Sequence, residues 1–193
     1  MIPLKLQSNI FVISGPSGVG KDTILENMAK NGTPYHFVIT ATTRKPRIGE
    51  KEGVNHFFVT EKKFHKMQKT NMLIESAFVF GNYYGVPKTQ VEQPILSGKN
   101  VLIRVDIQGA ERLRNLYPNS TLILIKPFTI DDLKDRLIER GANTKNEITK
   151  RLESAIYEMD NTNIFDYEII NYKDQIDKAI LELENIINKT SSN

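Results

Sequence analysis

The residues best suited to chemistry gather near the start of the chain, in the stretch Ser14-Gly15-Pro16-Ser17-Gly18-Val19-Gly20-Lys21-Asp22-Thr23. Its three glycines allow the backbone to curl so that successive N–H groups point into one concavity. Lys21 follows the last glycine and adds a mobile positive charge that suits the outer phosphates of a nucleotide. The spacing Gly-x4-Gly-Lys therefore predicts a phosphate-binding loop.

The sequence around this loop supplies the elements that would position it. An apolar run at residues 10–13 precedes the loop and an amphipathic pattern follows it, which gives the order strand, loop, helix. The start of the helix also brings the positive end of its dipole to the same place. The alternative is an ordinary strand-to-helix turn that happens to be rich in glycine.

Asp22 occupies the position after the lysine, where phosphate loops normally carry a Ser or Thr whose hydroxyl binds Mg²⁺. A carboxylate can also face a hard cation, either directly or through water. The alternative is that Asp22 only suits the first turn of the helix. Both interpretations remain open at this point.

The composition is that of an ordinary globular protein. The chain has 193 residues, 39% hydrophobic and 25% charged, which predicts one domain with a sizeable core. It has no cysteine, which excludes disulfides, thiolate metal sites and a cysteine nucleophile. The first residues lack a signal-peptide pattern and no apolar run could span a membrane, so we expect a cytoplasmic protein. A net charge of +3 is too weak to indicate nucleic-acid binding.

Apolar runs and amphipathic patterns alternate along the rest of the chain. We expect strands at residues 35–40, 72–80, 101–106, 120–125 and 167–170, and helices at residues 23–30, 61–71, 89–97, 110–116, 129–140, 146–160 and 176–187. This alternation predicts an α/β fold, a parallel sheet with helices on both faces and the phosphate loop at the carboxyl end of the first strand. Residues 40–90 interrupt the alternation and look like an inserted lobe.

Three further groups of residues could carry chemistry. Arg44 and Arg47 lie in a loop rich in hydroxyls and glycines and can form a fork-shaped anion site, although a solvated basic loop is the alternative. Tyr83 and Tyr84 suit a surface that grips a ring or a phosphate, or else they only pack in a hairpin. Asp106 ends a buried strand, and in phosphate-loop proteins such a carboxylate usually faces the metal.

Taken together, these motifs give the chain a clear resemblance to the guanylate kinase family, whose members phosphorylate GMP with ATP. The resemblance extends from residue 10 to about residue 187. It rests on several motifs in the family's order: Ser14-Gly15-Pro16-Ser17-Gly18-Val19-Gly20-Lys21, Thr42-Thr43-Arg44-Lys45-Pro46-Arg47-x-Gly49-Glu50, Gly81-Asn82-Tyr83-Tyr84-Gly85, Asp106-x-Gln108-Gly109-Ala110, Arg136-x3-Arg140-Gly141 and Lys150-Arg151-Leu152.

The resemblance implies an ATP:GMP phosphotransferase of purine nucleotide metabolism that also accepts dGMP, uses ATP and Mg²⁺, and acts as a monomer or a homodimer. It implies one guanylate-kinase-like domain over residues 8–193, with a parallel-sheet phosphate-loop core at residues 8–39, 91–128 and 160–190. An inserted GMP-binding lobe would span about residues 40–90 and a helical lid about residues 129–159. Neither a nucleic acid nor a membrane is an expected partner.

The resemblance also assigns roles to single residues. The residues expected to act on the transferring phosphoryl group are Lys21, Arg136, Arg140 and Arg151. The residues expected to bind ATP are Gly15, Pro16, Ser17, Gly18, Val19, Gly20, Lys21, Asp22, Thr23 and Asn171. The residues expected to bind GMP are Thr40, Arg44, Arg47, His56, Glu75, Tyr84 and Asp106. The Glu75 carboxylate would accept from N1–H and the 2-amino group of guanine. Asp22 and Asp106 are the expected contacts of Mg²⁺.

Four positions depart from the family's pattern. Asp22 replaces a Ser or Thr, and Arg104 replaces the first Asp of a strand that keeps only Asp106. His56 replaces a phosphate-binding Tyr, and an imidazole can still donate to phosphate. Val86 replaces a Ser or Thr that contacts guanine O6, so one contact to the base is lost. These departures leave the guanine selectivity and the metal geometry open.

Two other functions compete with GMP phosphorylation. The Gly-Lys-Asp ending of the loop, Asn55-His56 and Tyr83-Tyr84-Gly85-Val86 are also similar to ribose 1,5-bisphosphokinase, a relative that phosphorylates a sugar bisphosphate. That relative is poor in the Thr-Arg-x-Pro-Arg-x-Gly-Glu element, which is intact here at residues 43–50. The other candidate is a non-catalytic guanylate-kinase-like binding module, but such modules tend to lose the phosphate loop and the lid arginines.

Overall fold

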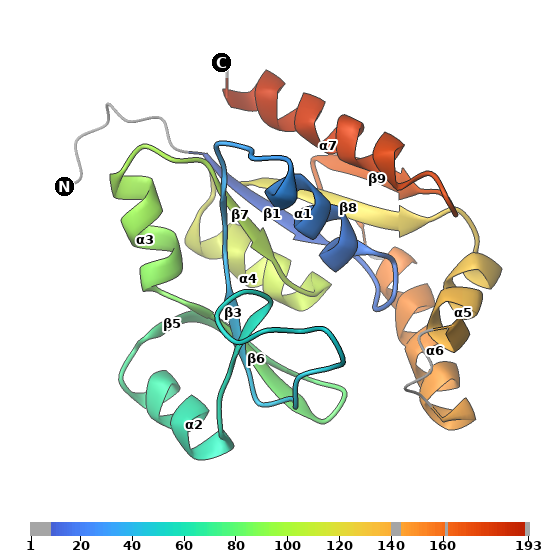
Figure 1. The fold of residues 1–193 in the computed structure, drawn as a ribbon, viewed down its shortest axis with the longest axis horizontal. Helices are drawn as coiled ribbons and strands as arrows, with labels where there is room; N and C mark the ends of the chain where they lie inside the picture. The colour runs from blue at the N-terminus through green and yellow to red at the C-terminus, as the bar shows by residue number, and fades with distance from the viewer. Residues whose placement is uncertain (1–8, 140–143, 161, 192–193) are drawn as a thin grey trace. The chain divides into compact units, whose positions relative to one another are not determined.

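The structure is a computed structural model that describes residues 9–139, 144–160 and 162–191. Its strands are β1 (Ile10–Ser14), β2 (His36–Phe37), β3 (Thr40–Thr42), β4 (His56–Phe58), β5 (Leu73–Val79), β6 (Asn82–Pro87), β7 (Val101–Arg104), β8 (Thr121–Pro127) and β9 (Tyr167–Asn171) (Figure 1). Its helices are α1 (Lys21–Lys30), α2 (Glu61–Lys69), α3 (Thr89–Leu96), α4 (Ile107–Leu116), α5 (Ile130–Glu139), α6 (Lys145–Asp160) and α7 (Ile176–Ser191). Among the residues described, no helix is both long and apolar enough to cross a membrane.

A five-stranded parallel sheet forms the centre of the fold, as predicted. Its strand order is β2-β7-β1-β8-β9, and the pairs β1–β8, β8–β9 and β2–β7 are all parallel. Strand β1 is buried along its whole length and β8 at every position but one. Continuous apolar runs of this kind are typical of strands that are covered on both faces. The phosphate loop leaves the sheet at the carboxyl end of β1.

The chain divides into two compact units. The first comprises Met1–Ile10 and Pro34–Ile103, and the second comprises Phe11–Thr33 and Arg104–Asn193. In the second unit, α7 packs against α1 and β9, and the apolar face of α7 buries Ala179, Ile180, Leu183, Ile186 and Ile187. This packing follows from the amphipathic pattern of α7, because one apolar stripe of a helix must be covered.

The first unit contains a separate four-stranded mixed sheet with the order β4-β3-β6-β5. Strands β3 and β4 are parallel, whereas β3–β6 and β5–β6 are antiparallel. Its core is formed by Ala41, Val59 and Phe64, against which the partly buried Phe57, Met67, Leu73 and Tyr83 pack. We refer to these seven residues as the small-sheet core.

The prediction of a single strand at residues 35–40 is wrong in one respect, because these residues are divided between the two sheets. Strand β2 pairs with β7, and the backbone N–H of Val38 still donates to the Leu102 carbonyl at 2.9 Å. The N–H of Ile39 instead donates to the side-chain oxygen of Gln90 at 3.2 Å. The backbone partner therefore changes at this point, and β3 begins at Thr40 in the small sheet.

Two helices are longer than the sequence pattern predicted. Helix α4 begins at Ile107 because the side chain of Asp106 caps it and accepts a hydrogen bond from the N–H of Gly109 at 2.7 Å. Helix α7 continues to Ser191, and the hydroxyls of Thr190 and Ser191 donate to backbone carbonyls one turn earlier. The other predicted helices are confirmed, with ends that differ by a few residues at most.

Replacing Phe64 by alanine tests the small-sheet core. Phe64 is fully buried and stacks on Tyr83 with the ring centroids 5.3 Å apart. We expect Phe64→Ala to lower the free energy of unfolding by about 3–5 kcal/mol, because it removes a buried ring and leaves a cavity. Chemical denaturation measures this change. Leu96→Ala, at a side chain that is 60% exposed, is the control and should cost less than about 0.5 kcal/mol; equal losses would contradict the assignment of this core.

Candidate functional site

The phosphate loop, residues 14–21, depends on glycines with left-handed backbone. Gly15, Gly18 and Gly20 have φ angles of 138°, 92° and 100°. A Cβ atom at Gly15 would lie 2.1 Å from the carbonyl oxygen of Ile125 in β8, so no side chain fits there. A Cβ atom at Gly20 would lie 2.5 Å from Nδ2 of Asn171. The loop therefore does more than turn the chain. Its backbone at Gly15 lies directly against the backbone of β8, and at Gly20 against the Asn171 side chain at the end of β9.

Lys21 is held by the loop itself. Its Nζ donates hydrogen bonds to the carbonyl oxygens of Gly15 at 2.5 Å and Pro16 at 3.1 Å. Burial lowers the pKa of Lys21 below its ordinary value, against the opposing attraction of the Asp22 and Glu158 carboxylates. The ammonium therefore lies partly desolvated inside the curl of the loop, which is where phosphate oxygens would be recognised.

Glu158 is a site residue that the sequence analysis missed. Burial raises the pKa of Glu158, although a hydrogen bond from Ser154 at 2.8 Å and the charge of Lys21 act in the opposite direction. Glu158 lies seven residues after Arg151 on α6, so both project from one face of that helix. This helical spacing from a predicted lid arginine is the signal that could have identified it.

Asp22 makes an ion pair with Arg104, with 2.7 Å between Oδ1 and the guanidinium. The Arg104 side chain is only 14% exposed, whereas that of Asp22 is 42% exposed. Next to Arg104, the N–H of Val105 donates to the Ile13 carbonyl at 3.2 Å, which ties this segment to the end of β1. Two of the four departures from the family's pattern are therefore partners of each other.

The predicted lid arginines contact the phosphate loop. Arg136 on α5 donates to the carbonyls of Val19 at 2.9 Å and Asn171 at 2.8 Å. The Asn171 amide also donates to the Val19 carbonyl, at 2.7 Å. Arg151 on α6 donates to the hydroxyl of Ser17 at 2.9 Å. Arg140, the third predicted lid arginine, lies outside the described residues.

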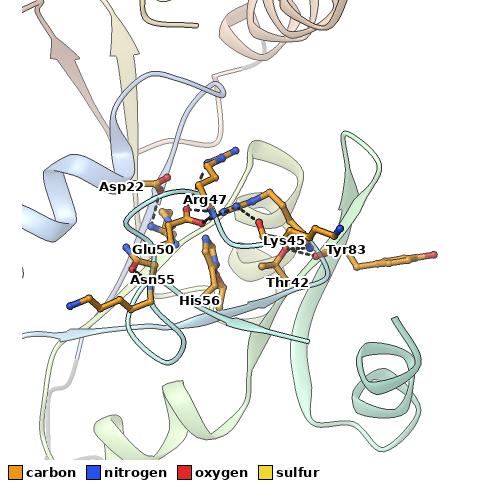
Figure 2. Close-up of polar contacts among 12 residues, drawn as sticks. Asp22, Thr42, Lys45, Arg47, Glu50, Asn55, His56 and Tyr83 are labelled. Atoms are coloured by element: carbon orange, nitrogen blue, oxygen red, sulfur yellow. Dashed lines mark hydrogen bonds and ion pairs between the residues drawn. The ribbon is translucent and has the colours of Figure 1, made fainter. Parts of the chain in front are cut away.

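In the first unit, Glu50 organises the loop that joins β3 to β4. Both oxygens of Glu50 accept from the guanidinium of Arg44 at 2.9 Å, and one also accepts from the backbone N–H of Arg47 at 2.7 Å. The Arg47 guanidinium is 3.9 Å from the same carboxylate, and Figure 2 shows Glu50 pointing toward Arg47. Burial would raise the pKa of Glu50, but these hydrogen bonds outweigh it and hold the pKa below its ordinary value.

Arg44 keeps one donor for another partner. Within the part of the chain that the structure describes, its Nε is buried and meets no hydrogen-bond acceptor. Its guanidinium lies 5.8 Å from the centre of the Phe58 ring. Burial alone would lower the pKa of Arg44, but Glu50 and Tyr84 outweigh it and raise the pKa. An unpaired buried donor on a charged group is costly, so it favours an anionic ligand here over a simply solvated basic loop.

The other predicted GMP-binding residues come from the small sheet. Thr40 and His56 are paired across β3 and β4, with Oγ1 and Nδ1 hydrogen-bonded at 2.8 Å. The rings of His56 and Tyr84 lie 6.1 Å apart, edge to face. Tyr83 instead packs into the small-sheet core, 4.9 Å from His65 and 4.7 Å from Phe78 between ring centres. Of the two adjacent tyrosines, Tyr83 has the packing role and only Tyr84 remains a candidate for binding.

Glu75 and Val86 are direct partners in the antiparallel pair of β5 and β6. Cross-strand partners project to the same face of a sheet, so these two side chains are neighbours. Glu75 is 6% exposed and Val86 is fully buried. The predicted base-reading carboxylate therefore has an apolar neighbour in the place where the family has a hydroxyl.

Comparison with known proteins decides the family. The guanylate kinase family model matches residues 7–190, nearly the whole chain. This chain belongs to the guanylate kinase family. Guanylate kinase of Shouchella clausii (strain KSM-K16) is 36% identical over 178 residues, which cover 92% of this chain and 86% of that protein. Guanylate kinase of Wolbachia sp. subsp. Brugia malayi (strain TRS) is 40% identical over 181 residues, which cover 93% of this chain and 92% of that protein.

A solved structure from this family has a similar fold. The crystal structure of guanylate kinase from Anaplasma phagocytophilum has a TM-score of 0.76 to this chain at 29% identity. The match covers 98% of this chain and 89% of that chain. The α/β fold predicted from the alternation of strands and helices is confirmed by this similarity.

The predicted site residues of this guanylate kinase family member form two groups. Among the described residues, those assigned to ATP and to phosphoryl transfer gather in the second unit around the phosphate loop. Those assigned to GMP lie on the small sheet and its Arg44–Arg47 loop in the first unit. Asp106 is the exception, because it lies in the second unit, where its charge acts on Lys21. The individual roles of these residues remain predictions.

A pH-dependent loss of stability tests the Glu50 network. The folded-state pKa of Glu50 is lowered, so its contribution is present above its ordinary pKa and is lost as the pH falls through the folded value. We expect Glu50→Gln to lower the unfolding free energy by about 2 kcal/mol at pH 7, because it leaves the Arg44 charge without its partner. Below about pH 4 the gap to the unmodified chain should narrow.

Denaturation curves at several pH values measure this gap. Glu92→Gln is the control, because Glu92 pairs with Lys88 at 3.5 Å with both side chains about half exposed. Its effect should stay below about 0.5 kcal/mol at every pH. A Glu50→Gln deficit that did not change between pH 7 and pH 3 would argue against an ionised Glu50 as the source.

Proposed function

We propose a residue-level account of GMP phosphorylation, the activity that this chain has as a member of the guanylate kinase family. The reaction is ATP + GMP → ADP + GDP. The arrangement around Lys21 is the single observation that carries the ATP half of the proposal, because a partly desolvated ammonium held by the Gly15 and Pro16 carbonyls at the start of α1 suits an anion.

The ATP phosphates would bind the backbone of residues 15–20 together with Lys21. The hydroxyl of Ser14 supports this placement, since it is buried at the base of the loop and has no partner within the described residues. Arg136 and Asn171 both donate hydrogen bonds to the carbonyl of Val19, so they fix the position of the loop at that residue. We assign Asn171 to the adenine side and Thr23 to the start of α1 next to the phosphates.

The GMP phosphate would bind Arg44, Arg47, His56 and Tyr84. The unpaired Nε of Arg44 supports this role, because a phosphate oxygen would satisfy it. Glu75 would read the base by accepting from N1–H and the 2-amino group of guanine, two donors that adenine does not present on that edge. Thr40, hydrogen-bonded to His56, would lie beside the base. We assign these residues to a GMP-binding lobe at about residues 40–90.

No general base is required for the transfer. A GMP phosphate oxygen is already a nucleophile at neutral pH, so the protein has to position the two nucleotides and neutralise charge. Lys21, Arg136 and Arg151 would supply positive charge to the transferring phosphoryl group. Arg136 would exchange its carbonyl acceptors at Val19 and Asn171, and Arg151 its hydroxyl acceptor at Ser17, for phosphate oxygens as a helical lid at about residues 129–159 closes.

Mg²⁺ fits this account through Asp22 and Asp106. Within the described residues, no cluster of three or more metal-binding side chains is present, and Mg²⁺ sites built on nucleotide phosphates need only one or two carboxylates. The cap at Gly109 uses Oδ1 of Asp106, and the pair with Arg104 uses Oδ1 of Asp22. When bound, Mg²⁺ would neutralise charge on the ATP phosphates.

An ADP-release assay over several acceptors tests the function. GMP and dGMP should be phosphorylated, while AMP, UMP and ribose 1,5-bisphosphate should give little ADP. ADP release that depends on ribose 1,5-bisphosphate rather than on GMP would overturn the proposal in favour of sugar-phosphate transfer.

Lys21→Ala should abolish phosphoryl transfer while the fold survives, because it removes the charge inside the phosphate loop. Steady-state kinetics measure kcat, and circular dichroism checks the fold. Lys30→Ala is the control, since Lys30 is exposed at the end of the same helix. Retention of more than about a tenth of kcat, a loss of less than about 1.4 kcal/mol, would refute the role of Lys21.

Glu75→Gln should raise KM for GMP by more than about tenfold and leave KM for ATP within about twofold. The change puts a donor in front of the donors of guanine, and a buried unmatched contact costs on the order of 1–3 kcal/mol. Steady-state titrations of each substrate measure the two constants. Equal effects on both substrates would show that Glu75 does not read the base.

A further inference from the structure

The ion pair between Asp22 and Arg104 places opposite charges at the entrance of the phosphate loop. Asp22 is the second residue of α1 and follows Lys21 directly. A fixed negative charge at this position would repel the phosphates that the loop is built to hold. The Arg104 guanidinium lies 2.7 Å from this carboxylate, and its side chain is largely buried. A cation is therefore held next to a carboxylate that would otherwise oppose the binding of an anionic ligand.

The backbone fixes this cation relative to the loop. Arg104 is the last residue of β7, and the next residue, Val105, donates its N–H to the carbonyl of Ile13. Ile13 precedes Ser14, at which β1 ends and the phosphate loop begins. Arg104 is therefore anchored by a strand end on one side of the loop, and Asp22 by a helix start on the other.

The pair also acts on Lys21. Burial is the main influence that lowers the pKa of Lys21, while Asp22 raises it and Arg104 lowers it. The two members of the pair thus have opposite effects on the ammonium. Lys21 is bonded to the carbonyls of Gly15 and Pro16. Because Arg104 neutralises Asp22, the attraction that would draw the Lys21 ammonium out of the loop toward the Asp22 carboxylate is weaker.

We infer that Arg104 is a positioning residue for the nucleotide, which neutralises Asp22 so that the phosphate loop keeps a net positive charge for a polyphosphate before any metal ion binds. This inference rests on the proposed ATP site. Asp22 and Arg104 act as a pair, so the loss of Arg104 should weaken nucleotide binding because the charge of Asp22 remains. An ion pair with a purely structural role would instead affect stability and leave nucleotide affinity alone.

A double-mutant cycle separates these possibilities. The variants are Arg104→Gln, Asp22→Asn and the double substitution, each of which removes charge and keeps a polar side chain. The probe is ADP, titrated by calorimetry in EDTA so that no metal contributes. We expect Arg104→Gln to weaken ADP binding at least fivefold, Asp22→Asn to tighten it because Arg104 is then uncompensated, and the double variant to bind within about twofold of the unmodified chain.

Arg114→Gln is the matched control. Arg114 pairs with Asp166 in the same unit, and it contacts Ser120 just before β8 begins, whereas the phosphate loop lies at the carboxyl ends of the strands. Removing this guanidinium should leave ADP affinity unchanged even if the melting temperature falls. Melting temperatures of all four variants identify any loss of folded protein, and affinity is compared only for variants that remain folded at the titration temperature.

The outcomes distinguish this inference from the proposed function. If the unmodified chain binds ADP and phosphorylates GMP but Arg104→Gln binds ADP as tightly, the inference is overturned and the function stands. A double variant as weak as Arg104→Gln would overturn it too, because the effect would then not depend on Asp22. If the unmodified chain neither binds ADP nor phosphorylates GMP, the proposed function itself fails.

Discussion

The close approach of the phosphate loop to β8 is the constraint on which the nucleotide site depends. Because a Cβ atom at Gly15 would collide with the Ile125 carbonyl, the chain can leave β1 along this path only with glycine. The turn sets the positions of the Gly15 and Pro16 carbonyls that hold Lys21 and of the Val19 carbonyl that accepts from α5 and β9. The path of the backbone through Gly15 therefore determines where the charged groups of the site lie.

Four cations of the candidate site bond to neutral or negative groups of the protein. Lys21 and Arg136 are bonded to backbone carbonyls, Arg104 to Asp22 and Arg44 to Glu50. Isolated charges removed from water are costly, and these bonds offset part of that cost. Exchanging a carbonyl for a phosphate oxygen is favourable because the phosphate carries the opposite charge.

The sequence was sufficient for the features that depend on local pattern. The spacing of Gly15, Gly20 and Lys21 predicted the loop, and the alternation of apolar and amphipathic runs predicted the parallel sheet. It could not show where the run at residues 35–40 divides, because the apolar and β-branched pattern is continuous through the run and the side chain that marks the change is the distant Gln90. It identified Asp22 and Arg104 as separate anomalies, since nothing in a local pattern reports an ion pair between residues far apart in the chain.

The bonds of Glu50 have an entropic consequence for substrate binding. They join positions 44, 47 and 50, so the loop is closed on itself by the protein's own groups. The conformational freedom of these residues was given up when the chain folded, so a ligand that binds the loop need not order it again. For the phosphate site proposed at Arg44 and Arg47, this means a preorganised surface, so that the free energy of the phosphate contacts would go into affinity rather than into ordering the chain.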